Sequence, residues 1–203
     1  MRLVATRRPR QASRHAHLVG GRPRSACRHG DRGQSLVEFS LILGPLMLLL
    51  LGIVQFGFIF NTYVTLTNAT REAARAGTIV VYDQTQSKAT NDLIRNQAVL
   101  ATLTSSMNLL STSSPQFTTG TTWTQSGPTS TSTTVTTTYT NGDLTITYMA
   151  VSPVVDSDPR TGERITVSAR YHQDLVIPLI ANLLPRDTGG RLQLGGVVTM
   201  VIN

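Results

Sequence analysis

The chain has 203 residues, 40% of them hydrophobic, and a formal net charge of +7. This length leaves room for one modest folded domain beside a membrane segment, and it excludes two. Residues 1–33 hold nine arginines and one acid, Asp31, which gives +8, whereas the remaining residues give 9 − 10 = −1. The positive charge therefore belongs to the first 33 residues and does not indicate a nucleic-acid-binding domain.

Residues 1–33 form a basic leader that we expect to stay in the cytoplasm, because positive charge beside a membrane helix is retained on that side. The leader contains Cys27, the single cysteine of the chain, together with His15, His17 and His29. Their spacing fits no usual zinc pattern, and one thiol cannot supply a site of several thiolates. We therefore expect no metal and no cofactor.

Residues 34–60 are predicted to form a transmembrane helix. From Phe39 to Phe60 there are 22 residues without a formal charge, and as a helix they would span about 33 Å, enough to cross a bilayer. Pro45 is tolerated in a membrane helix, and Gln55 is the strongly polar side chain deep in the run. A buried core helix is the alternative, although cores seldom use so long a stretch without a polar face.

Glu38 stands at the start of this apolar run, where a carboxylate is costly unless it finds a partner. The positive end of the helix dipole is one favourable environment for it. Gly33 lies five residues earlier, and this arrangement resembles a type IV prepilin processing site. Cleavage after Gly33 would make Gln34 the first residue and Glu38 the fifth. In pilus-like assemblies the carboxylate of the fifth residue can pair with the α-amino group of a neighbouring subunit.

The wider stretch GQSLVEFSLILGPLMLLLLGIVQFGFIFNTYVTLTNATREAARAG resembles the TadE/TadG-like family of tight-adherence (Flp, type IVb) pilus biogenesis. The shared features are a VEF tripeptide, a proline about two turns on, an FG pair and a segment like NATREAARAG. Two departures are Gln55, where members often have an acid, and Pro45, which is displaced by one position. The resemblance implies a minor pilin or pseudopilin of the bacterial cytoplasmic membrane, acting in pilus assembly and surface adhesion. Its implied partners are prepilin peptidase, other pilin-like subunits and the tight-adherence secretion machinery.

A conventional secretory signal peptide is the competing interpretation of this region. Its cleavage site should closely follow an apolar region of about 7–15 residues. The one A-x-A candidate, Ala74-Arg75-Ala76, lies well beyond Phe60. We therefore expect the apolar segment to be retained.

Residues 61–110 are expected to hold a helical extension and a second helix. The extension, Asn61–Gly77, has a face of Tyr63, Leu66, Ala69 or Thr70, Ala73 and Gly77, which would let a sheet approach closely. TIVVY, residues 78–82, reads as strand-like. The second helix is predicted over about Lys88–Leu110, with Thr90 or Asn91 as its cap and an apolar side marked by Leu93, Ala98 or Val99, Leu103 and Leu110.

Residues 111–134 are rich in serine and threonine, which is typical of flexible, disordered or glycosylated segments. Residues 135–203 are predicted to be β-rich. Alternating side chains on both sides of Asn141-Gly142 predict a hairpin, and further strands are expected over 164–171 and 195–202. Residues 178–184 could form a short helix or an apolar loop. The fold class is α+β and pilin-like: a long transmembrane helix extends into an extracytoplasmic domain with a second helix and an antiparallel sheet.

We find no catalytic constellation after the leader, and we expect neither an enzyme nor a small-molecule substrate. His172 is interpreted as a surface histidine on a strand, near Asp174. Asp156, Asp158 and Glu163 are interpreted as solvated turn acids, with a calcium site as the alternative, although their spacing fits no EF-hand. An unprocessed single-pass anchor that presents a β-rich binding module is the alternative function. A membrane-tethered enzyme lacks the chemistry.

Overall fold

The computed structural model describes residues 31–154, 159–177, 182 and 184–203. The basic leader, apart from its last three residues, lies outside the described residues, as do Asp156, Asp158 and most of 178–184. The described chain falls into two units that meet between Leu43 and Gly44, and each is treated by itself. The elements, in order, are α1 (Asp31–Thr78), α2 (Lys88–Ser106), β1 (Thr124–Ser130), β2 (Thr134–Asn141), β3 (Leu144–Val151), β4 (Arg164–Gln173) and β5 (Leu192–Val201).

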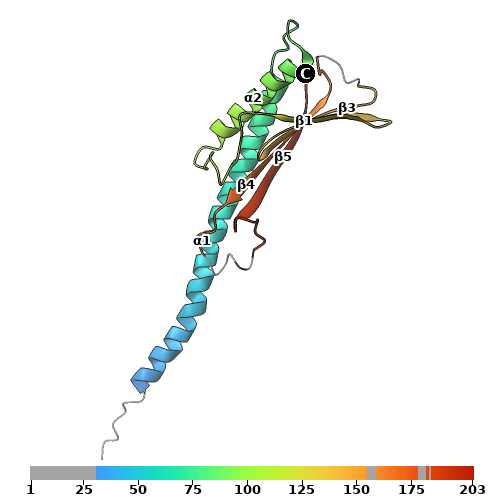
Figure 1. The fold of residues 1–203 in the computed structure, drawn as a ribbon. Coiled ribbons are helices and arrows are strands. Elements are labelled where there is room, and N and C mark those ends of the chain that lie inside the picture. Colours follow the sequence, from blue (N-terminus) through green and yellow to red (C-terminus); the bar gives the residue numbers. More distant parts are fainter. Residues whose placement is uncertain (1–30, 155–158, 178–181, 183) are drawn as a thin grey trace, which may run out of the picture. The chain divides into compact units, whose positions relative to one another are not determined.

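Helix α1 includes the whole apolar run and the predicted extension (Figure 1). It begins at Asp31, three residues before the expected start. Pro45 lies inside the helix; it has no N–H to offer the carbonyl of Leu41, one turn earlier. The helix ends at Thr78, one residue beyond the predicted end of the extension.

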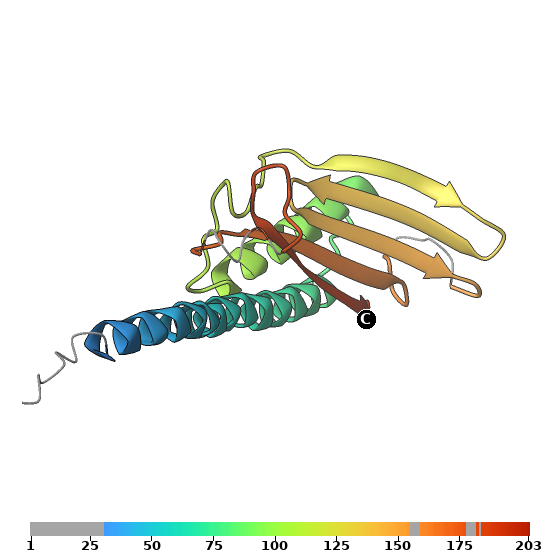
Figure 2. The ribbon, with the colours of Figure 1, turned by 90° about the horizontal axis from the view of Figure 1, so that it is seen from below.

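The five strands form one antiparallel sheet in chain order, β1-β2-β3-β4-β5 (Figure 2). The alternation predicted for β2, β3 and β4 is confirmed: along β3 and most of β4, buried and more exposed side chains alternate. The buried face of the sheet packs against α1 and α2. With one long apolar helix, a second helix and an antiparallel sheet, the predicted α+β class is confirmed.

The predicted hairpin between β2 and β3 is present, but its turn lies one residue later than expected. Asn141 pairs with Leu144, so Gly142 and Asp143 form the turn and Asn141 is the last residue of β2. Of these residues only Gly142 has a positive φ, 60°, and glycine at the first central position is typical of a type II′ turn. A Cβ at Gly142 would overlap the carbonyl group of Thr118, because the chain before β1 packs closely on the turn.

Two expectations for the region between the helices are wrong. TIVVY forms no strand; residues 79–82 are irregular, with Ile79 and Val81 exposed. The N-cap of α2 is Ser87, whose hydroxyl accepts a hydrogen bond from the backbone N–H of Thr90 at 3.2 Å. Asn91 instead holds the preceding loop, since its side chain donates to the Asp83 carbonyl at 2.9 Å and accepts from the Asp83 N–H at 3.0 Å.

The buried side of α2 is also more polar than its sequence pattern predicts. Val99 and Leu103 are buried as expected, but Leu93 is exposed. In the first half of the helix the buried side chains are polar or charged: Asn91, Asp92, Arg95 and Asn96. Periodicity of apolar residues cannot find such a face, so the prediction selected Leu93 wrongly.

The serine- and threonine-rich segment contains an ordered strand, β1, whose seven residues are all exposed. β1 is an edge strand, and its pairing with β2 shifts between Ser126 and Thr129, around Gly127 and Pro128. A proline and a bulge are common ways to prevent further pairing at a sheet edge. Over residues 124–130 the serine- and threonine-rich composition therefore accompanies a strand.

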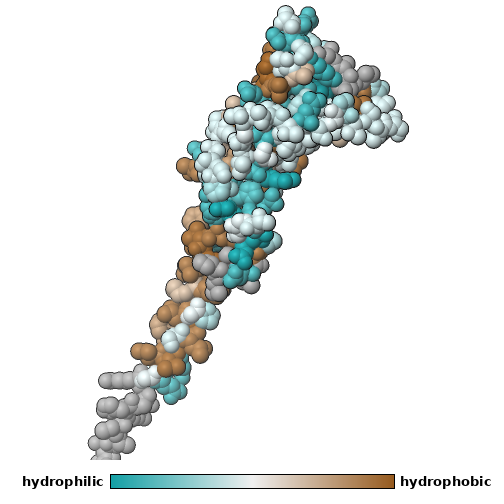
Figure 3. All heavy atoms as spheres, in the orientation of Figure 1, coloured by the Kyte–Doolittle hydropathy of each residue, from teal (hydrophilic) through white to brown (hydrophobic). Residues whose placement is uncertain are grey.

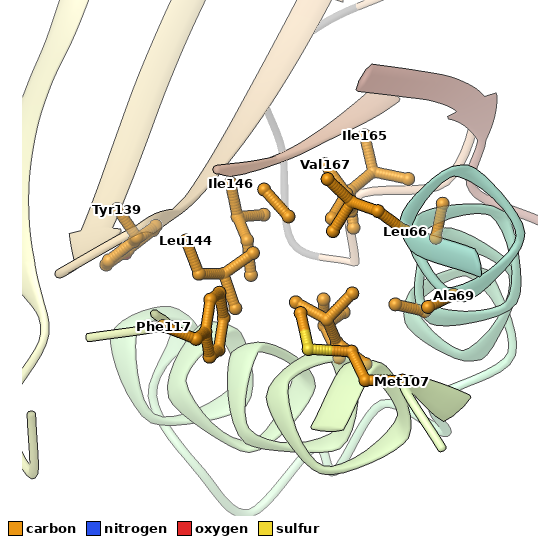
Figure 4. Close-up of a cluster of buried hydrophobic side chains, with 14 of the residues drawn as sticks. Leu66, Ala69, Met107, Phe117, Tyr139, Leu144, Ile146, Ile165 and Val167 are labelled. Atoms are coloured by element: carbon orange, nitrogen blue, oxygen red, sulfur yellow. The ribbon is translucent and has the colours of Figure 1, made fainter. Parts of the chain in front are cut away.

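The core lies between the sheet and the two helices (Figure 4). Leu66 and Ala69 of α1 face Ile165 and Val167 of β4, while Phe117 lies beside Leu144. The small residues of α1 permit a close approach: a Cβ on Gly196 of β5 would lie 2.6 Å from the hydroxyl of Thr70. The predicted packing face of α1 is therefore confirmed, except that Tyr63 is exposed.

Candidate functional site

The first half of α1 presents apolar side chains to its surroundings along the whole run (Figure 3). Phe39, Leu41, Phe56 and Phe60 are each more than half exposed. Within the described residues, α1 is the one helix whose length and composition suit a membrane span, and no part of its most apolar stretch is buried. The alternative of a buried core helix is therefore wrong, because a core helix would be covered by protein.

Gly33, Gln34 and Glu38 lie in the first two turns of α1. The side-chain amide of Gln34 donates to the Glu38 carboxylate, Nε2 to Oε1, at 3.1 Å. Residues four apart lie on one side of a helix, so an amino group at position 34 would be within one turn of this carboxylate. A Cβ on Gly33 would meet no atom within 4 Å, and Glu38 is exposed.

Gln55 has a different environment, since its side chain is only 1% exposed. Its Oε1 accepts hydrogen bonds from the backbone N–H groups of Val176, at 3.0 Å, and Ile177, at 3.3 Å. Two turns further along α1, the Thr62 hydroxyl donates to Gln173 Oε1 at 2.6 Å. The sequence identified Gln55 as the polar exception in the run, but it gave no indication of a partner more than a hundred residues away.

A buried ion network joins α2 to the loop before β4, and the sequence did not predict it. Arg160 Nε and Nη2 each donate to the Asp92 carboxylate at 2.8 Å, and Nη1 donates to Glu163 at 2.7 Å. The three side chains are almost completely buried. The interpretation of Glu163 as a solvated turn acid is therefore wrong: it is one of two carboxylates that neutralise a buried guanidinium.

Two tyrosines complete this network. The Tyr139 hydroxyl donates to Asp92 at 2.9 Å, and the Tyr148 hydroxyl donates to Asn96 at 2.6 Å. The Arg160 guanidinium lies 4.5 Å from the centre of the Tyr148 ring, close enough for a cation–π contact. Burial, with the charge of Asp92, raises the pKa of Tyr139 and of Tyr148 well above the usual value. Both hydroxyls therefore remain neutral donors, which suits a structural role.

His172 lies near the end of β4, away from the buried ion network that precedes the start of this strand, and it links three segments of the chain. Nδ1 lies 2.5 Å from Asp187 Oδ2 and Nε2 lies 3.2 Å from Asp143 Oδ1. The side chain is 19% exposed, so the interpretation as an ordinary surface histidine is wrong. Asp174 does not contact it; that carboxylate accepts from Gln116 and pairs with Arg191, each at 2.7 Å.

Burial lowers the pKa of His172, but its hydrogen bonds to Asp187 and Asp143, together with their charges, outweigh that effect. The pKa of His172 therefore lies above its ordinary value. Among the described residues, no group of three or more His, Cys, Asp or Glu side chains is placed to hold a metal ion.

Comparison with known protein families identifies the helix that carries Gly33, Glu38 and Gln55. Residues 33–75 match the family described as TadE-like protein. The N-terminal helix of this chain is TadE-like. The match covers the apolar run and its helical extension, and it supports the predicted resemblance to the TadE-like family over this segment. No curated protein and no solved structure matches the chain.

The TadE-like segment ends at Arg75, three residues before α1 ends. Its second half is the part of α1 that packs on the sheet, with Leu66, Ala69 and Ala73 buried. Ala74, the first residue of the A-x-A candidate, is also fully buried, in the last two turns of α1. The geometry thus agrees with retention of the TadE-like segment, since cleavage there would cut through the core.

Proposed function

We propose that this chain is a TadE-like minor pilin or pseudopilin that acts in assembly of a tight-adherence (Flp-type) pilus. In this proposal the chain crosses the bacterial cytoplasmic membrane once, with the basic leader in the cytoplasm and residues from about Asn61 onward outside. The observation that carries the proposal is the match over residues 33–75 on a helix with two environments. Its first half is uncovered and apolar, and its second half belongs to the core of the domain.

The proposal includes removal of residues 1–33 by a prepilin peptidase. Gly33 presents no side chain to obstruct such an enzyme, and no other group crowds the space beside its Cα. Because α1 begins at Asp31, the first turn has to unwind before the bond after Gly33 can enter an active site. Helix ends fray readily, and glycine weakens the turn further.

After cleavage the new α-amino group of Gln34 would add a positive charge at the positive end of the helix, which is unfavourable. Glu38, one turn away, can offset this charge within one subunit. The same carboxylate can instead accept the α-amino group of a neighbouring pilin-like subunit. Because Glu38 is exposed, both pairings remain available, and the second would link assembly to processing.

Crosslinking from α1 in cells tests the proposed function. A photoreactive residue at Leu41, which is 72% exposed beside Glu38, should capture another pilin-like subunit of the tight-adherence system. The photoreactive residue placed instead at Thr129, on the exposed edge strand β1, is the control for position. A membrane-inserted protein that yields no adduct from Leu41 in cells that assemble pili would contradict the proposal and favour a single-pass anchor with a β-rich binding module.

A further inference from the structure

The loop that follows β4 descends along α1 toward the apolar run. Gln173, the last residue of β4, is bonded to Thr62, and Val176 and Ile177 are bonded to Gln55. From Gln173 to Val176 or Ile177 the loop advances by three or four residues. Over the same step, the bonded residue on α1 changes from Thr62 to Gln55, seven residues nearer the N-terminus, or about 10 Å along the helix axis. Three extended residues cover roughly the same distance. The loop therefore runs directly along the helix, antiparallel to it.

Gln55 marks the depth that the described part of the loop reaches. Gln55 precedes Phe60, the end of the uncharged run, by five residues, or about 7–8 Å of helix. In a helix that spans the membrane, this position lies inside the outer boundary of the hydrocarbon. Backbone N–H groups at that depth need an acceptor within the protein. Gln55 Oε1 supplies one acceptor for two such groups.

The loop has the side chains expected at this depth. Leu175, Val176 and Ile177 are apolar, and no charged residue occurs between Asp174 and Arg186. The Val176 side chain is 69% exposed, so nothing in the described part of the protein covers it. Directly before the apolar residues, Asp174 pairs with Arg191 at 2.7 Å. A charged pair next to exposed apolar residues is the arrangement of a segment that lies in a membrane interface.

We propose that the loop at Leu175–Ile177 is a second membrane contact, which enters the outer leaflet beside α1 and contacts lipid acyl chains. Gln55 is the positioning residue that holds the loop at this depth. The contact ties the sheet to the membrane surface, because β4 ends at Gln173, directly before this loop. The inference rests on the proposed membrane span of α1. It commits to lipid as the occupant, and a neighbouring protein surface is an outcome of the test.

Fluorescence quenching in vesicles tests the contact. The full chain with Cys27→Ser and Val176→Cys is labelled with an environment-sensitive dye. It is reconstituted in phosphatidylethanolamine and phosphatidylglycerol with spin-labelled acyl chains. Phe56→Cys, at nearly the same level on α1 and 68% exposed, reports the span itself, and Ser130→Cys on β1 reports an aqueous position. Quenching of the dye at Val176 should reach the level at Phe56, and Ser130 should stay unquenched.

The outcomes separate the contact from the span. Quenching at Phe56 without quenching at Val176 overturns the loop contact and leaves the span intact. Absence of quenching at both positions overturns the span and, with it, the loop contact. Blue-shifted emission at Val176 without lipid quenching identifies a covering protein surface and also overturns the proposal.

Variants of Gln55 test its positioning role in the same assay. Gln55→Leu removes the acceptor and should abolish quenching at Val176 while leaving quenching at Phe56 unchanged. Gln55→Glu keeps an oxygen acceptor and should restore quenching at Val176. If Gln55→Leu leaves the Val176 signal at full strength, Gln55 does not position the loop.

Discussion

At the scale of single residues, the proposed membrane span would make the position of Glu38 costly unless its carboxylate is paired. Glu38→Gln keeps the shape and the hydrogen bond with Gln34 available, but it removes the charge. Insertion and processing should persist, because the bond after Gly33 is five residues away. The adduct from Leu41 and the number of surface filaments should both fall.

The contrasting interpretation treats Glu38 only as a carboxylate at the positive end of a helix. Its loss would then cost about 0.3–1 kcal/mol and leave assembly intact. Filaments and adducts at wild-type levels in Glu38→Gln would contradict the pairing role. Gly33→Leu is the control for Glu38→Gln, because it should block processing while the Glu38 carboxylate is retained.

Arg160 is the residue on which the buried network depends. Arg160→Met removes the cation closest to two buried carboxylates, with Arg95 still 3.9 Å from Asp92, and this should reduce the free energy of unfolding by about 3–5 kcal/mol. Arg164→Met, at an exposed position on β4, is the control and should change it by less than about 0.5 kcal/mol. Urea unfolding followed by circular dichroism measures both, and equal effects would show that the network contributes little.

At the scale of elements, the contact between α1 and β5 depends on one of two adjacent glycines. A Cβ on Gly196 would collide with the Thr70 hydroxyl, whereas a Cβ on Gly195 would meet no atom within 4 Å. Gly196→Ala should therefore destabilise the protein by about 1–3 kcal/mol. Gly195→Ala should be neutral or stabilise it by up to about 1 kcal/mol. Thermal unfolding of the two variants measures these changes in stability. An equal loss of stability in both would contradict the close approach of α1 and β5 at Gly196.

His172 joins the β2–β3 turn, β4 and the loop before β5, and this junction should make stability depend on pH. The folded-state pKa of His172 is raised from its ordinary value of 6.5, so its contribution is fully present below pH 6.5 and is lost as pH rises through the raised value. Asp187 has the opposite sign, because hydrogen bonds from the Arg191 backbone, and then from His172, lower its folded-state pKa below 3.8. Its contribution is present above that value and is lost in acid.

The measurement is the melting temperature against pH for the wild type and for His172→Gln. The wild type should lose stability as pH rises above 6.5, and His172→Gln should remove that slope while retaining the acid limb. An unchanged slope in His172→Gln would assign the pH dependence to other groups.

The sequence predicted the elements whose causes are local. Alternation around Leu144 and Ile146 gave the strands, and the uncharged run gave the helix. Prediction from the sequence failed where residues distant in the chain determine the structure. The burial of Asp92 depends on Arg160, 68 positions away, and Gln55 meets the backbone of Val176, 121 positions away. Nothing in the pattern around Asp92 or Gln55 encodes such a partner.

At the scale of the whole molecule, α1 combines two functions in one continuous helix. Its first half supplies the membrane segment of the proposed pilin-like subunit, and its second half supplies the helix against which the sheet packs. In the proposed function, this continuity makes the assembly contacts around Glu38 and the fold of the extracytoplasmic domain depend on one element. Processing after Gly33 would change the charge at one end of that element without cutting the folded part.

Determination of the mature N-terminus tests the central claim most directly. The full chain is expressed in cells that contain the prepilin peptidase, extracted from the membrane, and examined by intact mass and N-terminal sequencing. The proposed function predicts a chain that begins at Gln34 and has lost the arginine-rich leader, and it predicts an uncut precursor for Gly33→Leu. A wild-type chain that still begins at Met1 would contradict the claim and favour the unprocessed membrane anchor.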